Sequence, residues 1–259
     1  MLLLKRTVNN FTSTIYFLSY VENDITMTEK PNTLFRRPLY GRRNGPSLGA
    51  GRRRLYEERL ARFGLTPSGV LSTSLDPRDI LDNSKCVWLE IGFGAGEHLA
   101  ATALHNPDVL MIGCEHYMAG VASCLSKLDQ QGVSNARVHR GDARDLMDAF
   151  PPASIERAYL LYPDPWPKTR HRKRRFINSE TVSSFARIIA PQGELRIASD
   201  IPEYIAWSEE YLRKAPEFDA VHRSAEDTKT AWDGWTQTRY EAKALREGRT
   251  PAYLRYRRR

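Results

Sequence analysis

The chain has 259 residues, of which 41% are hydrophobic and 27% are charged, as is usual for one globular α/β domain with an extension. It contains no run of about 18 apolar residues, which argues against a membrane-spanning helix. The net charge of +8 favours a polyanionic partner, of which nucleic acid is the commonest. The three cysteines are odd in number and widely spaced, which argues against a disulfide framework or a metal site and favours a cytoplasmic protein.

The N-terminal part of the chain reads as a basic extension. Residues 28 to 54 are rich in Arg, Gly and Pro, and the only apolar run before them is too short for a signal peptide. We expect residues 1–45 to be disordered, and translation from Met27 in place of Met1 stays open. A short helix is predicted over 51–63, at the start of a single domain that covers 46–259.

From residue 86 onward, strand and helix patterns alternate. Such alternation predicts a Rossmann-like α/β fold, with a central, mostly parallel sheet and helices on both faces. The predicted strands are 86–91, 109–115, 136–140, 157–162 and 193–199, and the predicted helices are 98–104, 117–131, 179–190 and 202–214.

Acidic residues occur at the ends of five consecutive predicted strands. Because ligands bind at the carboxyl ends of parallel strands, these acids are expected to line one site. Packing of a core does not require such a series. The five residues are Glu90, Glu115, Asp142, Asp164 and Asp200.

The turn after the first strand has the pattern of a nucleoside-binding loop. Gly92, Gly94 and Gly96 allow a tight turn and close approach of a ligand to the backbone. Glu115 follows 23 residues after Gly92 and can accept hydrogen bonds from ribose hydroxyls, as in proteins that bind NAD or S-adenosylmethionine. Glu90 favours S-adenosylmethionine, because a carboxylate attracts a cationic sulfonium and repels a pyrophosphate. Asp142 could accept from the adenine amino group.

The stretch Tyr162 to Arg175, YPDPWPKTRHRKRR, is the most specific in the chain. Prolines on both sides hold Asp164 in a rigid loop, and Trp166 offers a flat face for a base. Six of the eight residues from Lys168 to Arg175 are Lys or Arg, which favours contact with phosphates.

These motifs resemble those of the bacterial-type tRNA (guanine-N7)-methyltransferases, from about Tyr40 to the C-terminus. The resemblance is carried by Leu89 to Gly94, by Pro163 to Trp166 with the basic run behind it, and by Thr238 to Glu241. It implies the fold of the class I S-adenosylmethionine-dependent methyltransferases and methylation of guanine N7 in the variable loop of tRNA. The sequence itself requires no protein partner.

The resemblance also assigns roles to individual residues. It implies that Asp164 is the catalytic residue. It places Glu90, Glu115, Asp142 and Asp164 on the cofactor, and it places Lys168, Asp200, Thr238, Arg239, Tyr240 and Glu241 on the guanosine. It assigns RNA binding to Arg170, His171, Arg172, Lys173, Arg174 and Arg175. The chain departs from the family at Tyr240, where Phe is usual, and at the residues around Asp200, where Thr-Asp-Trp is usual.

Three other readings stay open. A base N-methyltransferase that acts on an exocyclic amine of DNA or RNA also has a proline-rich acidic loop. A Rossmann oxidoreductase is disfavoured by the glycine spacing and by Glu90. An RNA-binding protein with a vestigial cofactor site is the third, and the complete series of acids argues against it.

Overall fold

The structure is a computed structural model that describes residues 38–40, 49–65, 75–81 and 84–259. Leu39–Arg259 forms one compact unit. The extension expected over 1–45 lies outside the described residues, apart from residues 38–40. In the described ranges, no helix is both long enough and apolar enough to cross a bilayer. The same ranges contain no group of three or more His, Cys, Asp or Glu residues that could hold a metal ion.

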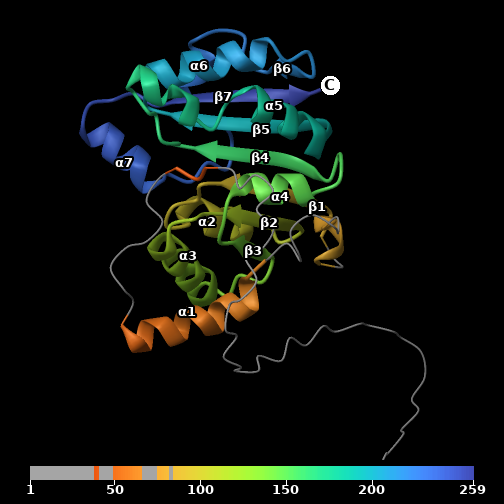
Figure 1. Cartoon of the computed structure of the whole chain (residues 1–259), viewed down its shortest axis with the longest axis vertical. Helices are drawn as coiled ribbons and strands as arrows, with labels where there is room; N and C mark the ends of the chain where they lie inside the picture. The colour runs from red at the N-terminus through yellow and green to blue at the C-terminus, as the bar shows by residue number, and fades with distance from the viewer. Residues whose placement is uncertain (1–37, 41–48, 66–74, 82–83) are drawn as a thin grey trace, which may run out of the picture. The chain divides into compact units, whose positions relative to one another are not determined.

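Seven strands form a single sheet in the order β3-β2-β1-β4-β5-β7-β6 (Figure 1). The pairs within β1 to β5 are parallel, and β7 runs antiparallel to both β5 and β6. The prediction of a mostly parallel sheet is therefore confirmed. The strands are β1 (Cys86–Ile91), β2 (Val109–Cys114), β3 (Ala136–His139), β4 (Ile155–Leu161), β5 (Ile189–Ser199), β6 (Phe218–Ala220) and β7 (Ala252–Arg258).

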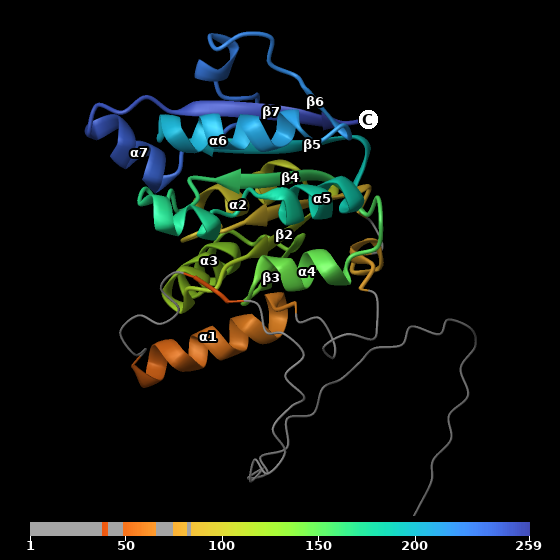
Figure 2. The ribbon, with the colours of Figure 1, turned by 45° about the horizontal axis from the view of Figure 1, so that its top comes forward.

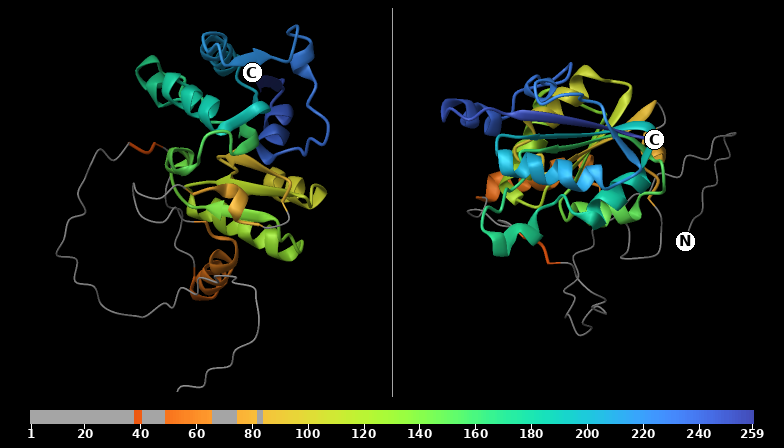
Figure 3. Two further views of the ribbon diagram at one scale, coloured as in Figure 1. Left: turned by 90° about the vertical axis from the view of Figure 1, so that its right-hand side faces the viewer. Right: turned by 90° about the horizontal axis from the view of Figure 1, so that it is seen from above.

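Helices cover both faces of the sheet (Figures 2 and 3). One hydrophobic cluster packs α1 (Ala50–Phe63), α2 (Glu97–His105) and α3 (Met118–Gln130) on one face. The other cluster packs α4 (Ala143–Ala149), α5 (Ser179–Ile188) and α6 (Pro202–Arg213) on the opposite face. Strand β1 supplies both layers, because Val87, Leu89 and Ile91 point into the second cluster and Trp88 into the first.

The structure adds elements that the sequence patterns did not predict. These are α4, β6, β7 and α7 (Arg239–Arg246), together with the 3-10 helices η1 (Pro77–Asp79), η2 (Thr169–Arg174) and η3 (Asp227–Lys229). The helix predicted over 179–190 ends at Ile188, because β5 already begins at Ile189.

The carboxyl ends of the parallel strands β1 to β5 all lie at the same edge of the sheet. The loops that follow β2, β3, β4 and β5 carry Glu115, Asp142, Asp164 and Asp200. Glu90 is the second-to-last residue of β1, and its side chain is buried against α2, with only 2% of its surface exposed. The fold thus brings four of the five acids to the same edge.

Candidate active site

A pocket of about 450 Å³ lies at this edge, within the range of about 300–1,000 Å³ that is typical of small-molecule sites. The predicted site residues that line it are Gly92, Gly94, Glu115, Asp142, Asp164, Lys173, Arg174, Arg175 and Tyr240. The predicted residues that do not line it are Glu90, Gly96, Lys168, Arg170, His171, Arg172, Asp200, Thr238, Arg239 and Glu241.

The glycine turn after β1 adopts a backbone that requires glycine. Gly92, Gly94 and Gly96 have φ angles of 72°, 59° and 78°, which L side chains rarely adopt. A Cβ on Gly96 would also lie 2.5 Å from Sγ of Cys124, so this position has no room for a side chain. A Cβ on Gly92 would meet nothing within 4 Å, which leaves open space beside the turn on the pocket wall.

Glu115 is fixed by backbone amides at the end of β2. Its carboxylate accepts from the N–H of Gly94 at 3.0 Å, of His116 at 2.8 Å and of Tyr117 at 2.9 Å. Three bonds use three of the roughly four acceptor positions of a carboxylate. One position remains on a side chain that lines the pocket, so Glu115 can accept a further hydrogen bond from a ligand.

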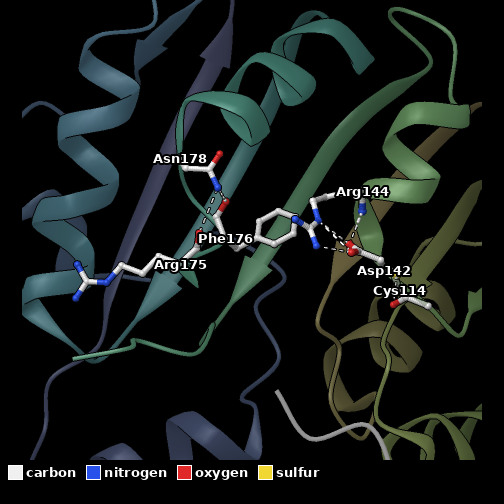
Figure 4. Close-up of polar contacts among 7 residues, drawn as sticks. Cys114, Asp142, Arg144, Arg175, Phe176 and Asn178 are labelled. Carbon is white, nitrogen blue, oxygen red and sulfur yellow. Dashed lines mark hydrogen bonds and ion pairs between the residues drawn. The ribbon is translucent and has the colours of Figure 1, made fainter. Parts of the chain in front are cut away.

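Asp142 follows β3 and caps the next helix. Its carboxylate accepts from the backbone N–H of Arg144 at 3.0 Å, and so satisfies an amide at the start of α4. The guanidinium of Arg144 folds back onto the same carboxylate, with Nη2 at 2.5 Å from Oδ2 (Figure 4). Phe176 lines the same pocket. The pair forms one wall of the pocket.

Asp164 stands on a strained loop after β4. The flanking residues Tyr162 and Trp166 have φ angles of 50° and 42°, although neither is glycine. Such conformations cost on the order of 1–3 kcal/mol each and cluster at functional sites. Asp164 is exposed, and its carboxylate makes no hydrogen bond or ion pair with the described residues. A carboxylate acceptor is thus held at the pocket without a partner among the described residues.

Glu90 lies under the glycine turn and does not reach the pocket. Its carboxylate is 2.8 Å from Nδ1 of His98 on α2, and both side chains are 2% exposed. The His98 ring in turn packs against Tyr159 and Trp235, with centroids 4.8 and 5.3 Å away. The geometry therefore shows a buried pair that supports the turn, where the sequence suggested direct contact with the ligand.

The basic run forms η2 and then enters the fold. The guanidinium of Arg174 contacts two aromatic rings, 4.8 Å from the centroid of Tyr40 and 4.9 Å from that of Trp166. Arg172 pairs with Glu203 at 2.8 Å. Arg175 is only 2% exposed, so the expectation that every member of the run faces RNA needs correction at this residue. Its burial follows from its position, because the chain turns inward after η2 toward α5.

The residues expected to hold guanosine separate into two groups. Tyr240 is 52% exposed and lies at the pocket, at the start of α7. Thr238 caps α7 by accepting from the N–H of Glu241 at 3.1 Å, and Glu241 is buried. The Glu241 carboxylate accepts from Nε1 of Trp235 at 2.8 Å and from the hydroxyl of Tyr253.

Two other predicted contacts are engaged in ion pairs. Asp200 pairs with Arg249 at 2.5 Å, and Arg239 pairs with Glu97 at 2.5 Å. Neither Asp200 nor Arg239 lines the pocket. Both pairs lie close to the carboxyl edge of the sheet, because Asp200 directly follows β5 and Glu97 begins α2 after the glycine turn.

Several pocket residues escaped the sequence analysis. Tyr40 belongs to a segment without periodicity, so no sequence signal marks it. Arg144 stands two residues after Asp142, and that spacing could have suggested the ion pair. Phe176, Asn178 and Thr181 reach the pocket through the start of α5, where Asn178 and Thr181 form a reciprocal cap.

Comparison with known proteins agrees with this geometry. A family model described as "Putative methyltransferase" matches residues 84–253. A tRNA (guanine-N(7)-)-methyltransferase of Roseobacter denitrificans is 47% identical over 227 residues, which cover 85% of this chain and 95% of the relative. One from Paracoccus denitrificans is 44% identical over 230 residues, covering 86% and 96%.

A solved structure supports the fold alone. The crystal structure of the 16S rRNA methyltransferase KamB matches with a TM-score of 0.53 at 15% identity, over 75% of this chain and 98% of that chain. The sequence relatives match this chain at 47% and 44% identity over 85% and 86% of its length, whereas this fold-level likeness has 15% identity. The chain therefore belongs to the tRNA (guanine-N(7)-)-methyltransferase family.

Proposed function

We propose that this protein transfers a methyl group from S-adenosylmethionine to N7 of a guanine in tRNA, in the variable loop as the family resemblance implies. One observation carries the proposal most strongly. Asp164, a carboxylate with no partner among the described residues, shares a pocket with Glu115 and Asp142 and leads directly into the cationic helix η2. A nucleoside donor and a polyanionic acceptor could therefore meet at one place.

The volume of the pocket and the hydrogen-bond acceptors that line it support binding of S-adenosylmethionine. Glu115 has a free acceptor position for a ribose hydroxyl, and the open space at Gly92 admits a ligand against the backbone. Asp142 is partly neutralised by Arg144, so we propose that the Asp142–Arg144 pair together borders the adenine. Glu90 supports the glycine turn from beneath through His98.

When bound, S-adenosylmethionine supplies a methyl group on a positively charged sulfur, which leaves as a neutral thioether. Guanine N7 carries a free lone pair and no proton, so no side chain has to act as a general base. The guanine ring becomes positive as N7 gains the methyl group. A fixed carboxylate such as Asp164 favours that charge in the transition state, and catalysis is mainly positioning and electrostatics.

The guanosine and RNA contacts follow from exposure. We propose that Tyr240 contacts the base, because it is exposed at the pocket beside Gly94. Lys168, Asp200, Thr238, Arg239 and Glu241 remain proposed contacts that require the ion pairs or the cap around them to open. The solvent-facing part of the basic run, from Lys168 to Arg174, is proposed to bind tRNA phosphates. A cytoplasmic location is inferred from the tRNA substrate and from three cysteines that are free thiols.

The test is to identify the methylated nucleoside. The purified protein is incubated with unmodified tRNA and isotopically labelled S-adenosylmethionine, and the digested RNA is analysed by chromatography and mass spectrometry. We expect label in 7-methylguanosine of the variable loop. Label on an exocyclic amine would point to the other class of base methyltransferase. If calorimetry detects no binding of the cofactor, the chain would instead be an RNA-binding protein.

A further inference from the structure

Arg175 ends the basic run but differs from its neighbours in its surroundings. Lys168, Arg170 and Lys173 are exposed, whereas Arg175 is 2% exposed and ranks with the largest fully buried side chains. Its side chain extends away from Asp142 and Arg144 (Figure 4). A guanidinium in this position cannot reach an RNA phosphate.

The buried guanidinium joins the catalytic loop to α6. Nε of Arg175 donates to the carbonyl oxygen of Pro165 at 2.8 Å, and Nη2 donates to Oε1 of Glu203 at 2.8 Å. The guanidinium carbon lies 4.8 Å from the centroid of Trp207 and 5.8 Å from that of Tyr204. Glu203, Tyr204 and Trp207 all belong to α6, so three contacts tie Arg175 to one rigid element.

Helix α6 is itself fastened to the segment that follows Arg175. Nε1 of Trp207 donates to the carbonyl oxygen of Ile177 at 2.7 Å, and the N–H of Ile177 donates to the Tyr204 hydroxyl at 3.5 Å. Contacts with α6 therefore hold both the guanidinium of Arg175 and the backbone two residues after it. Arg175 can in this way restrict the movement of the Pro165 carbonyl oxygen that it binds on the loop.

The Pro165 carbonyl oxygen lies next to Asp164 in the chain, so its position affects the position of the Asp164 carboxylate. Pro165 directly follows Asp164, and the prolines of the loop have no N–H to donate. A backbone carbonyl is therefore the natural anchor for this segment. The left-handed conformations of Tyr162 and Trp166 persist only where surrounding contacts hold them.

We propose that Arg175 is a positioning residue: by holding the Pro165 carbonyl against α6 it fixes the Asp164 carboxylate at the pocket. It acts on the reaction through the loop and makes no contact with tRNA. This inference rests on the proposed function for its activity readout, so a second readout independent of activity is needed.

The experiment compares R175M with R258M. Arg258 also donates Nε to a backbone carbonyl at 2.8 Å, that of Ala186, but it lies on β7 and does not line the pocket. Methionine keeps the apolar stem and removes the donors in both variants. R175K serves as the conservative variant, because lysine keeps the charge but cannot bind Pro165 and Glu203 in the same geometry.

Activity is measured as kcat and KM for unmodified tRNA, at a temperature where thermal unfolding shows all variants to be folded. We expect R175M to lower kcat about tenfold or more with little change in KM, R175K to retain intermediate kcat, and R258M to match the wild type. A rise in KM alone would assign Arg175 to RNA binding and overturn the inference. Equal losses in R175M and R258M would show a general structural effect and would also overturn it.

The independent readout is ¹⁹F NMR of protein labelled with 5-fluorotryptophan, in which the Trp166 signal is assigned with W166F. The chain has five tryptophans, so the spectrum is simple. The positioning role predicts that R175M shifts or broadens the Trp166 signal, while R258M leaves this signal unchanged. An unchanged Trp166 signal in R175M would refute the positioning role. If the wild type makes no 7-methylguanosine, the proposed function fails and this signal still decides the role of Arg175.

Discussion

Asp164 differs from the other two acids of the pocket in its hydrogen bonds and ion pairs. The other two acids of the pocket are engaged, Glu115 by three backbone amides and Asp142 by Arg144. Asp164 alone among these three presents its carboxylate without a hydrogen-bond or ion-pair partner from the described residues. Its negative charge is therefore available to a developing positive charge on the guanine ring.

Replacement of Asp164 by asparagine keeps the shape and removes the charge. We expect kcat to fall about a hundredfold or more, by comparison with the loss of other electrostatic stabilisers. Single-turnover methylation of tRNA measures the effect. Asp233→Asn is the control, because Asp233 is also exposed and lies outside the pocket. Turnover of the Asp164 variant close to that of the control would remove Asp164 from the mechanism.

At this scale the sequence located the loop better than the individual contacts. Two prolines around an acid mark Asp164 directly, because proline restricts the backbone wherever it stands. No sequence signal distinguishes a buried arginine within a basic run from its exposed neighbours, so the sequence predicts the same role in RNA binding for Arg175 as for Arg174. The pairing of Glu90 with His98 depends on how α2 packs under β1, which local spacing does not specify.

The edge of the sheet at β3 is joined to the segment that follows α1. The N–H of Leu65 donates to the carbonyl of Val138 at 2.8 Å, and Nδ1 of His139 lies 3.0 Å from the carbonyl oxygen of Leu65. The other ring nitrogen of His139, Nε2, is buried without a hydrogen-bond partner among the described residues. Burial therefore lowers the pKa of His139, since a proton on Nε2 would have no acceptor.

This junction should weaken in mild acid. An unfolded chain protonates His139 with a pKa of about 6.5, whereas the folded chain resists protonation until lower pH. The stability contributed by the neutral ring is complete above the unfolded pKa and is lost as pH falls from about 6.5 toward the folded pKa.

His139→Gln removes this titration. Denaturant unfolding from pH 8 to 5 should show a steeper decline of the free energy of unfolding in the wild type than in the variant. The difference at pH 8, where His139 of the wild type is neutral in both the folded and the unfolded chain, measures packing and hydrogen bonding without titration and serves as the control. Parallel curves over the whole range would exclude His139 as the acid-sensitive group.

Among the elements, the five parallel strands were predictable and the C-terminal pair was not. Buried parallel strands read as continuous apolar runs, so β1 and β2 are plain in the sequence. Strand β7 has the sequence AYLRYRR, in which three arginines interrupt the apolar run although Tyr253, Leu254 and Tyr256 are buried. Helix α4 has only seven residues, too few for a periodic pattern. Strand order also depends on long-range pairing that no local pattern encodes.

Fewer side chains of the basic run are available to RNA phosphates than the net charge of the whole molecule suggests. Arg172 is paired with Glu203, and Arg175 is buried. Desolvation and the neighbouring cations lower the pKa of His171, so it contributes less positive charge near pH 7 than an unperturbed histidine would. The cations of the run that make no ion pair with described residues are Lys168, Arg170, Lys173 and Arg174.

Salt dependence of tRNA binding can count these contacts. Four phosphate contacts correspond to a loss of affinity of about 150-fold between 50 and 200 mM salt, whereas six would give more than about a thousandfold. Lys168, Arg170, Lys173 and Arg174 are replaced together by glutamine. The dissociation constant of tRNA is then measured by fluorescence anisotropy over this range of salt concentrations. We expect the slope of log K against log salt to fall by about 3.6. A further fall of about 0.9 on adding Arg172→Gln would contradict the assignment of Arg172 to its ion pair.

Strand β7 follows the other six described strands along the chain, yet it occupies an interior position in the sheet. Strand β7 lies between β5 and β6, and its final residue is next to the C-terminus. While the ribosome still holds these residues, β5 keeps an open edge and β6 has no strand to pair with. The sheet can therefore become continuous only after β7 has left the ribosome, and loss of β7 would leave an unpaired strand edge on β5.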